Sequence, residues 1–264
     1  MRGVAFNLPR RLPKLEMRIQ WRWSRWSSTT VAAKMFLVRH GQTHANRNRL
    51  IDGQTDSVLT DLGRRQAVAA GIALKDVHFG LAVSSDLPRA KATAEWLLGR
   101  NTMFERGAVR LATCKLLRER HFGSLDRIPT VEYMAHPEFD GWGGDFTPEG
   151  AETREEVRGR ASNFLLALVD LISKRHAVGG GHLNCLIVSH GVVIMELVRH
   201  LAREFECSFP DKATEELYEN QVAPNASITT FDIVVDTSNR GDAELRSVKC
   251  LKLYCDQHVI ERCE

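Results

Sequence analysis

One short stretch constrains the fold more than any other part of the chain. Four bulky apolar residues, 35–38, stop abruptly at Arg39-His40-Gly41. A short apolar run that ends in polar residues and glycine is typical of a buried parallel strand, and ligands of open α/β sheets bind where such strands end. The sequence therefore predicts that Arg39 and His40 lie at the mouth of a sheet.

A second stretch, residues 185–191, repeats this construction. Another apolar run ends in a histidine and a glycine, His190 and Gly191. Two histidines at strand ends in one α/β domain are difficult to explain by packing alone. They indicate a reaction centre to which each half of the chain contributes one imidazole.

The other periodic segments favour the α/β class. Apolar spacing predicts strands at 79–84 and 109–117. It also predicts one helix that begins after Thr60, a second at 89–98 and a third at 153–175. Alternating residues predict two edge strands at 227–235 and 248–254. We therefore expect a three-layer α/β/α sandwich with a mostly parallel central sheet and a C-terminal antiparallel edge.

The first 34 residues differ from the rest in charge. Residues 1–33 carry seven Arg or Lys against one Glu, so the net charge of +3 for the whole chain leaves the remainder at −3. Their basic and apolar residues fall on separate faces of a helix, as in mitochondrial transit peptides. We expect 1–34 to be a disordered leader or a targeting segment and 35–264 to form one domain, either cytoplasmic or mitochondrial.

Composition excludes several classes of partner. A slightly acidic folded part argues against nucleic-acid binding. No apolar run approaches the roughly 18 residues of a membrane span, and the six scattered cysteines are typical of a reducing compartment. We find no His/Cys cluster at metal-ligand spacing, so we expect neither a metal nor another cofactor. The oligomeric state is left open.

Three further segments carry candidate site residues. The long polar loop 42–57, with Thr43, Asn46 and Arg49, follows the first histidine and is expected to form a site wall. Arg89 lies in the first turn of a predicted helix, where an anion is favoured. Glu119 follows the strand predicted at 109–117, between two arginines, and is either part of a salt-bridged surface turn or a catalytic acid. The Gly- and Trp-rich insert 140–150 suits a lid or rim.

Together these residues fit a phosphoryl-transfer site. Arginines such as Arg39 and Arg89 offer planar donors to phosphate oxygens and supply positive charge without a metal. His40 would attack phosphorus to give a phosphohistidine. Glu119 would protonate the leaving oxygen and then accept a proton from water, and His190 would donate to the phosphoryl oxygens.

The ordered motifs resemble a known family. The segments Arg39-His40-Gly41, Ser84-Ser85-Asp86-Leu87 with Arg89, Leu117-Arg118-Glu119-Arg120 and Ser189-His190-Gly191 are similar to the motif set of the histidine phosphatase (phosphoglycerate mutase-like) superfamily. Within it, segments such as 146–150 and 207–210 are most similar to TIGAR-type fructose-2,6-bisphosphatases. Two departures are Gln42, where many members have glutamate, and Ala151, which interrupts a Gly-Gly-Glu turn.

The resemblance implies a function. It implies removal of the 2-phosphate from fructose 2,6-bisphosphate, with 2,3-bisphosphoglycerate as a further small phosphorylated substrate, and restraint of glycolysis. It implies that Arg39, His40, Asn46, Arg89 and His190 line the phosphate pocket with Glu119 as the proton donor. We expect Thr43 and Gly191 to complete the substrate site.

Two alternatives stay open. A phosphoglycerate mutase would return the phosphoryl group to the product, and we see no long insertion or tail of the kind associated with mutases. A catalytically inactive relative could serve as a binding partner, but the intact set of His40, Arg89, Glu119 and His190 argues against that reading.

Overall fold

The computed structural model describes residues 30–102, 109–177, 183–205, 207–211, 214, 217–218, 221–238 and 243–263. Of the predicted features, residues 1–29 of the leader and most of the turn between the edge strands lie outside these ranges. Within them, no helix has both the length and the apolarity that crossing a bilayer requires.

A six-stranded sheet in the order β3-β2-β4-β1-β5-β6 forms the centre of the molecule. Its strands are β1 (Thr30–Arg39), β2 (Phe79–Ser85), β3 (Leu111–Cys114), β4 (Leu183–Ser189), β5 (Ile228–Asp236) and β6 (Glu244–Cys255). The first four run parallel, and β5 and β6 are antiparallel to their neighbours. The predicted mostly parallel sheet with a C-terminal antiparallel edge is confirmed.

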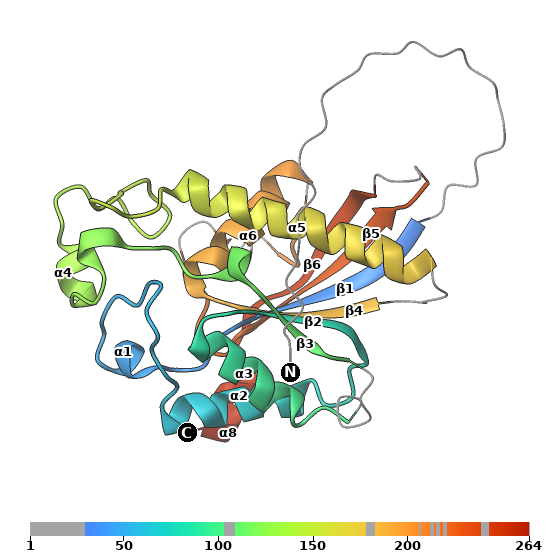
Figure 1. The fold of residues 1–264 in the computed structure, drawn as a ribbon, viewed down its shortest axis with the longest axis horizontal. Coiled ribbons are helices and arrows are strands. Elements are labelled where there is room, and N and C mark those ends of the chain that lie inside the picture. Colours follow the sequence, from blue (N-terminus) through green and yellow to red (C-terminus); the bar gives the residue numbers. More distant parts are fainter. Residues whose placement is uncertain are drawn as a thin grey trace, which may run out of the picture.

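Helices cover both faces of this sheet (Figure 1). The long helix α5 (Arg154–Ala177) and α6 (Gly191–Glu204) lie on one face. On the other face lie α2 (Asp61–Ala73), α3 (Pro88–Leu98) and α8 (Gln257–Cys263). Two short helices, α1 (His44–Arg47) and α4 (Thr130–Met134), lie at the end of the molecule where the parallel strands end. The three layers are those that the sequence predicts.

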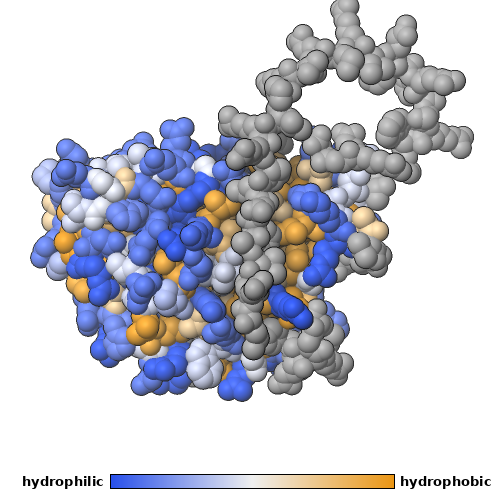
Figure 2. All heavy atoms as spheres, in the orientation of Figure 1, coloured by the Kyte–Doolittle hydropathy of each residue, from blue (hydrophilic) through white to orange (hydrophobic). Residues whose placement is uncertain are grey.

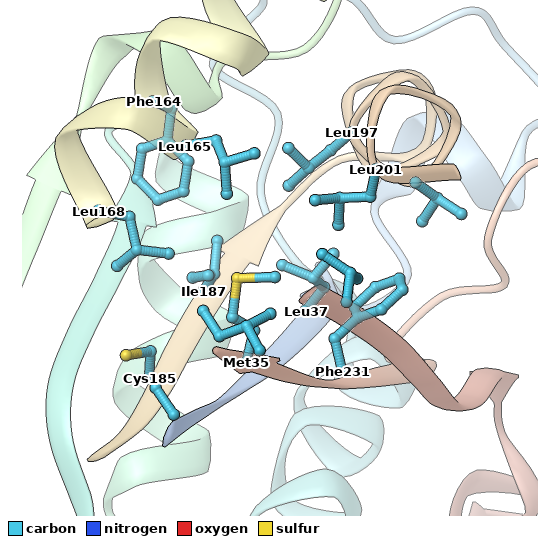
Figure 3. Packing of buried hydrophobic residues seen from close by; sticks show 14 of the residues in the cluster. Met35, Leu37, Phe164, Leu165, Leu168, Cys185, Ile187, Leu197, Leu201 and Phe231 are labelled. Carbon is cyan, nitrogen blue, oxygen red and sulfur yellow. The ribbon is translucent and has the colours of Figure 1, made fainter. Parts of the chain in front are cut away.

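The central position of β1 explains its continuous apolar run. Side chains alternate between the faces of a strand, and both faces here are covered. Met35 and Leu37 pack in the core under α5 and α6, as Figure 3 shows. Phe36 and Val38 point the other way, into the core with α2 and α3. Helices on both sides therefore fix the strand that carries Arg39.

The start of β1 corrects the predicted boundary of the leader. The strand begins at Thr30, not at Met35, so residues 30–34 belong to the fold. Val31 and Ala33 are buried, and this part of β1 pairs with residues 232–236 of β5. The sequence analysis missed the extension because its alternating pattern is short and lies next to the basic leader.

Two other boundaries also differ from the prediction. The strand predicted at 109–117 is only four residues long and continues as a 3-10 turn, η1 (Lys115–Leu117). In this turn the carbonyl of Leu117 accepts a hydrogen bond from the Ser189 hydroxyl at 2.9 Å, which ties η1 to the end of β4. The helix that Thr60 caps ends at Ala73, so Val77 lies beyond it.

On the face seen in Figure 2, hydrophilic residues cover most of the described surface, and apolar residues are scattered among them. The apolar residues of the core lie inside the layers instead.

Candidate active site

Two neighbouring strands bring the two predicted histidines together. β1 and β4 pair in parallel so that Arg39 lies opposite Ser189, and His40 and His190 follow directly. The His40 backbone N–H donates to the Ser189 carbonyl at 3.0 Å. The imidazole centroids are 5.1 Å apart and both rings are buried. The predicted meeting of one histidine from each half is confirmed.

The partners of the His40 ring define its tautomer. Nδ1 lies 2.8 Å from the carbonyl oxygen of Gly41, which can only accept a hydrogen bond, so Nδ1 carries the proton. Nε2 is then an acceptor, and Arg89 Nε donates to it at 3.3 Å. Burial, followed by the charges of Arg89 and Arg39, holds the pKa of His40 well below its ordinary value. The ring is therefore neutral at neutral pH, with a lone pair on Nε2.

Arg89 lies behind this imidazole and not on an open wall. Its terminal nitrogens donate to main-chain carbonyls of Asp52, Gly53 and Thr55 at 2.6–3.1 Å. Its guanidinium is 3.8 Å from the Asp52 carboxylate and fully buried. Only its Nε faces the His40 ring. Arg89 therefore links the loop 52–55 to the His40 ring through hydrogen bonds. The sequence analysis expected Arg89 to face an anion instead.

Arg39 and His190 each have buried side-chain nitrogens without a hydrogen-bond partner among the described residues. Arg39 Nη1 donates to the Ala223 carbonyl at 2.5 Å. Among the described residues, Arg39 Nε and both ring nitrogens of His190 are buried and make no hydrogen bond. Leaving buried donors unpaired costs about 1–3 kcal/mol each. Such a group of unpaired atoms next to His40 fits a site that an anion fills.

Burial also determines the charge state of His190. It lowers the pKa of His190 well below its ordinary value, and Arg89 and His40 lower it further. The pKa of Arg39 is lowered as well, mainly by burial. A neutral imidazole retains one N–H that it can donate to an oxygen.

Glu119 faces the site, while the two arginines beside it turn away. Its carboxylate accepts N–H groups of Arg120 at 2.8 Å and of Val192, in the first turn of α6, at 3.2 Å. Arg118 instead pairs with Asp86, and Arg120 donates to the carbonyls of Phe146 and Glu152. Of the two alternatives left open for Glu119, the salt-bridged surface turn does not fit, because Glu119 is buried and lies on a cavity wall.

An arginine of α5 fixes the segment that carries Glu119. Arg160 donates to the carbonyls of Leu116, Arg118 and Glu119, at 2.9 Å for the first and 3.1 Å for the last. The carboxylate of Glu152 holds the same guanidinium at 2.9–3.0 Å. Despite the departure at Ala151, Glu152 is therefore firmly placed, and it positions Glu119 through Arg160.

The residues after Gly41 form a capped helix. Thr43 and Asn46 make reciprocal side-chain to backbone hydrogen bonds at the start of α1, and the Thr43 hydroxyl also donates to Asp52 at 3.0 Å. Thr43 is buried and does not line the cavity, in contrast to Asn46. The expected substrate contact of Thr43 is therefore not part of this arrangement. Gln42 points away too, because its side chain accepts from Thr60 at the start of α2.

The glycines near the site allow close approach. A Cβ on Gly191 would lie 2.3 Å from a methyl group of Val222, and one on Gly41 would lie 2.3 Å from the Gly63 carbonyl oxygen. Gly191 begins α6 and lies beside Arg39. Its absent side chain therefore lets the chain near Val222 close over the site.

A cavity of about 360 Å³ lies beside His40, and its lining does not include His190, Arg89 or Gly191. Arg39, His40, Asn46 and Glu119 lie on its wall, and so do Arg49, Phe122, Trp142 and Asn225. Trp142 belongs to the insert that we expected to form a rim, and it stacks on Tyr133. A larger cavity of about 510 Å³, beside α2 and α8, contains none of the predicted site residues.

The sequence analysis did not assign Asn225 to the site. Its amide donates to the His40 carbonyl at 3.0 Å and to Asn46 Oδ1 at 3.1 Å. The segment before β5 gave no periodic signal, so only its Pro-Asn pair could have pointed to it.

Within the described residues, His, Cys, Asp and Glu side chains do not gather in groups that could hold a metal ion.

The order of strands and the two facing histidines are those expected of a histidine phosphatase, and comparison with known families gives the same class. Residues 35–234 match the histidine phosphatase superfamily (branch 1), and the chain belongs to this superfamily. It is therefore an enzyme of the phosphoric monoester hydrolase type.

Individual relatives give finer detail. The chain is 35% identical to fructose-2,6-bisphosphatase TIGAR B of Danio rerio over 84% of its own length and 93% of the relative's. It is 30% identical to fructose-2,6-bisphosphatase TIGAR of Mus musculus, over 84% and 94% of the two chains. Among solved structures it is similar to a mycobacterial glucosyl-3-phosphoglycerate phosphatase, with a TM-score of 0.66, 27% identity and coverage of 85% and 99%.

Proposed function

We propose that the chain removes a phosphoryl group from a small phosphorylated metabolite through a phosphohistidine at His40. The observation that carries the proposal is the neutral His40 ring, whose unprotonated Nε2 accepts only a 3.3 Å hydrogen bond from Arg89, together with the unpaired Nε of Arg39. Attack on phosphorus would require Nε2 to give up this hydrogen bond. A neutral imidazole can attack phosphorus, and donors fixed in advance stabilise the charge on the phosphoryl oxygens.

Two steps complete the reaction. In the first, His40 Nε2 forms a bond to phosphorus while the bond to the leaving oxygen breaks, and the carboxyl group of Glu119 gives its proton to that oxygen. In the second, Glu119 takes a proton from water as the water oxygen attacks phosphorus, and the phosphorus–nitrogen bond breaks to release orthophosphate. His190, Arg39 and Asn46 would bind the phosphoryl oxygens, and Arg89 would hold the His40 ring in position.

For the substrate, we propose fructose 2,6-bisphosphate, cleaved at the 2-phosphate, with 2,3-bisphosphoglycerate as a second substrate. The similarity to two fructose-2,6-bisphosphatases over most of both chains supports the first. Removing fructose 2,6-bisphosphate would restrain glycolysis, so we place the protein in the cytoplasm, or in mitochondria if the basic leader acts as a transit peptide.

A phosphoglycerate mutase activity is the second candidate. The chain is also similar to a phosphoglycerate mutase from Bacillus anthracis, with a TM-score of 0.60 and 26% identity. Both activities would start with the same phosphohistidine, and they differ in whether water or the bound product accepts the phosphoryl group. The third reading, an inactive binding partner, conflicts with the intact arrangement of His40, Glu119 and His190.

The test is a metal-free panel of fructose 2,6-bisphosphate, fructose 1,6-bisphosphate, 2,3-bisphosphoglycerate and 3-phosphoglycerate, assayed with the wild type and with His40→Ala. We expect orthophosphate from the bisphosphates, no 2-phosphoglycerate from 3-phosphoglycerate, and an acid-labile phosphoenzyme. His40→Ala should lose turnover and phosphoenzyme together. Retention of either by a folded His40→Ala protein would show that His40 is not the nucleophile, and formation of 2-phosphoglycerate would favour the mutase.

A further inference from the structure

The cavity wall carries an arginine that the proposed mechanism does not use. Arg49 lines the cavity together with Arg39 and His40. Its exposed side chain makes no hydrogen bond or ion pair with any residue in the described ranges. By contrast, the guanidinium groups of Arg89, Arg118, Arg120 and Arg160 are held by carbonyls or carboxylates. Arg49 is therefore a cation on this wall that is available to a ligand.

The backbone at Arg49 is held in an unusual conformation. Its φ is 53°, in the left-handed region, where a residue with a side chain costs about 1–2 kcal/mol. Its N–H donates to the Asn46 carbonyl at 3.0 Å, and its own carbonyl accepts from the Thr130 N–H at 2.7 Å. Such conformations persist only where the surroundings fix them, and they are concentrated at functional sites. Here α1 and α4 fix the point from which the side chain extends.

Asp52, which lines the same cavity as Arg49, already has partners of opposite charge. Asp52 lies 3.8 Å from Arg89 and 3.7 Å from Arg127. Its oxygens also accept hydrogen bonds from Thr43, Thr55 and Ser57 at 2.6–3.0 Å. Asp52 therefore does not compete for Arg49. The remaining carboxylate on the wall, Glu119, is held by backbone N–H groups.

We propose that Arg49 binds the second anionic group of the substrate, the one that is not transferred. The inference rests on the proposed function, because only a bisphosphate or a phosphorylated acid carries such a group. A guanidinium presents paired donors that match phosphate and carboxylate oxygens. Phe122 and Trp142 offer apolar surface to the carbon skeleton between the two anions. Arg49 is then a specificity-determining residue, selecting substrates with a second anionic group over simple monoesters.

The test compares Arg49→Asn, Arg49→Lys and the control Arg47→Asn in the full chain. Asparagine tolerates the left-handed conformation and removes the charge, whereas lysine keeps the charge. Arg47 is also exposed on α1, but it contacts His44 at 3.2 Å and does not line the cavity. Each variant is assayed with fructose 2,6-bisphosphate and 2,3-bisphosphoglycerate, and with 4-nitrophenyl phosphate, which carries one anionic group.

For Arg49→Asn, we expect kcat/KM for a bisphosphate, relative to 4-nitrophenyl phosphate, to fall about 10- to 100-fold, as for loss of one hydrogen bond to a charged group. The loss should come mainly from KM. Arg49→Lys should recover part of it, and Arg47→Asn should match the wild type. Equal losses on both kinds of substrate, or no loss on either, would overturn the inference.

The same assays distinguish failure of the substrate proposal from failure of the inference about Arg49. If the wild type cleaves 4-nitrophenyl phosphate but neither bisphosphate, the substrate proposal is wrong. The same bisphosphates are then tested as competitive inhibitors of 4-nitrophenyl phosphate cleavage. A Ki raised in Arg49→Asn and restored in Arg49→Lys would still support the inference, and a Ki that is the same in all variants would overturn it.

Discussion

At the scale of single residues, the site is built from groups that burial keeps neutral or unpaired. His40 and His190 lie side by side with their pKa values lowered by burial and by nearby arginines. A nucleophile must be unprotonated at its attacking nitrogen, so the environment that destabilises a charged imidazole would also prepare His40 for the role that we propose. This preparation makes the stability of the protein depend on pH.

The first prediction concerns that dependence. Both histidines have folded-state pKa values below their ordinary 6.5, so the unfolded chain takes up protons first as the pH falls. Stability should be complete above pH 6.5 and should decrease below it, at about 1.4 kcal/mol per pH unit for each buried histidine. Urea unfolding between pH 7.5 and 5.5 measures the slope.

Two variants check the origin of this slope. His190→Gln and His40→Asn each remove one titrating group, so either should be less dependent on pH than the wild type, whatever its absolute stability. If both variants keep the slope of the wild type, the two histidines are not its cause.

The sequence predicts which residues belong to the site where a motif follows a strand. It does not predict them where a contact depends on tertiary packing. His40, His190 and Glu119 follow apolar runs, so their convergence could be predicted. Asn225 lies in an irregular segment that gave no pattern, and only the fold brings it to the cavity. Arg49 belongs to the loop that was expected to form a site wall, but its place on the cavity surface depends on the fold. Arg89 shows the opposite limit: its place at a helix start was correct, but its partners are carbonyls of a loop whose path no pattern encodes.

At the scale of elements, the start of α2 is packed tightly against the loop that follows His40. A Cβ on Gly63 would lie 2.1 Å from the Gln42 carbonyl oxygen and 2.9 Å from two further backbone atoms. Thr60, the N-cap of α2, donates to the Gln42 side chain at 3.0 Å. The helix therefore fixes the main chain two residues after the proposed nucleophile.

Substituting Gly63 tests this packing. Helix propensity alone predicts that alanine stabilises a helix by about 0.5–1 kcal/mol. We expect instead that Gly63→Ala destabilises the protein by about 1–3 kcal/mol, as for other overpacked sites, and lowers kcat by displacing His40. Unfolding in urea and turnover of 4-nitrophenyl phosphate measure both effects.

The matched control is Gly159→Ala in α5. A Cβ at Gly159 would have no atom within 4 Å, so this variant should gain about 0.5–1 kcal/mol of stability and keep its activity. If the two variants behave alike, the contact between α2 and the His40 loop is looser than the structure shows.

At the scale of the whole molecule, the sheet extends beyond the region that the sequence motifs define. Residues 30–34 of β1 pair with β5, bury Val31 and place Lys34 3.0 Å from Asp232. The order of layers could be predicted from apolar periodicity, since each motif lies at a strand end. The extension could not, because five residues beside a basic segment carry too little periodicity.

Removal of these five residues should therefore be costly. Burial of a valine contributes about 1.5–3 kcal/mol, and each strand hydrogen bond about 1 kcal/mol. We expect a chain that begins at Met35 to unfold at a lower urea concentration than one that begins at Thr30, with a loss of about 3 kcal/mol or more. Equal midpoints would mean that residues 30–34 add nothing to the fold.

The place of β1 between β4 and β5 also determines when the enzyme can become active during its synthesis. His40 leaves the ribosome early, but the asparagine that holds its carbonyl lies 185 positions later. At 5–20 residues per second, that interval lasts about 10–40 s. Until β4 is made, both edges of the strongly apolar strand β1 lack their final neighbours, and the edge that pairs with β5 lacks its neighbour for the whole interval. Such unpaired strand edges are prone to aggregation. A chain that stops before Asn225 would carry every catalytic residue that we propose, including both histidines and Glu119, and still lack the amide that holds the His40 carbonyl.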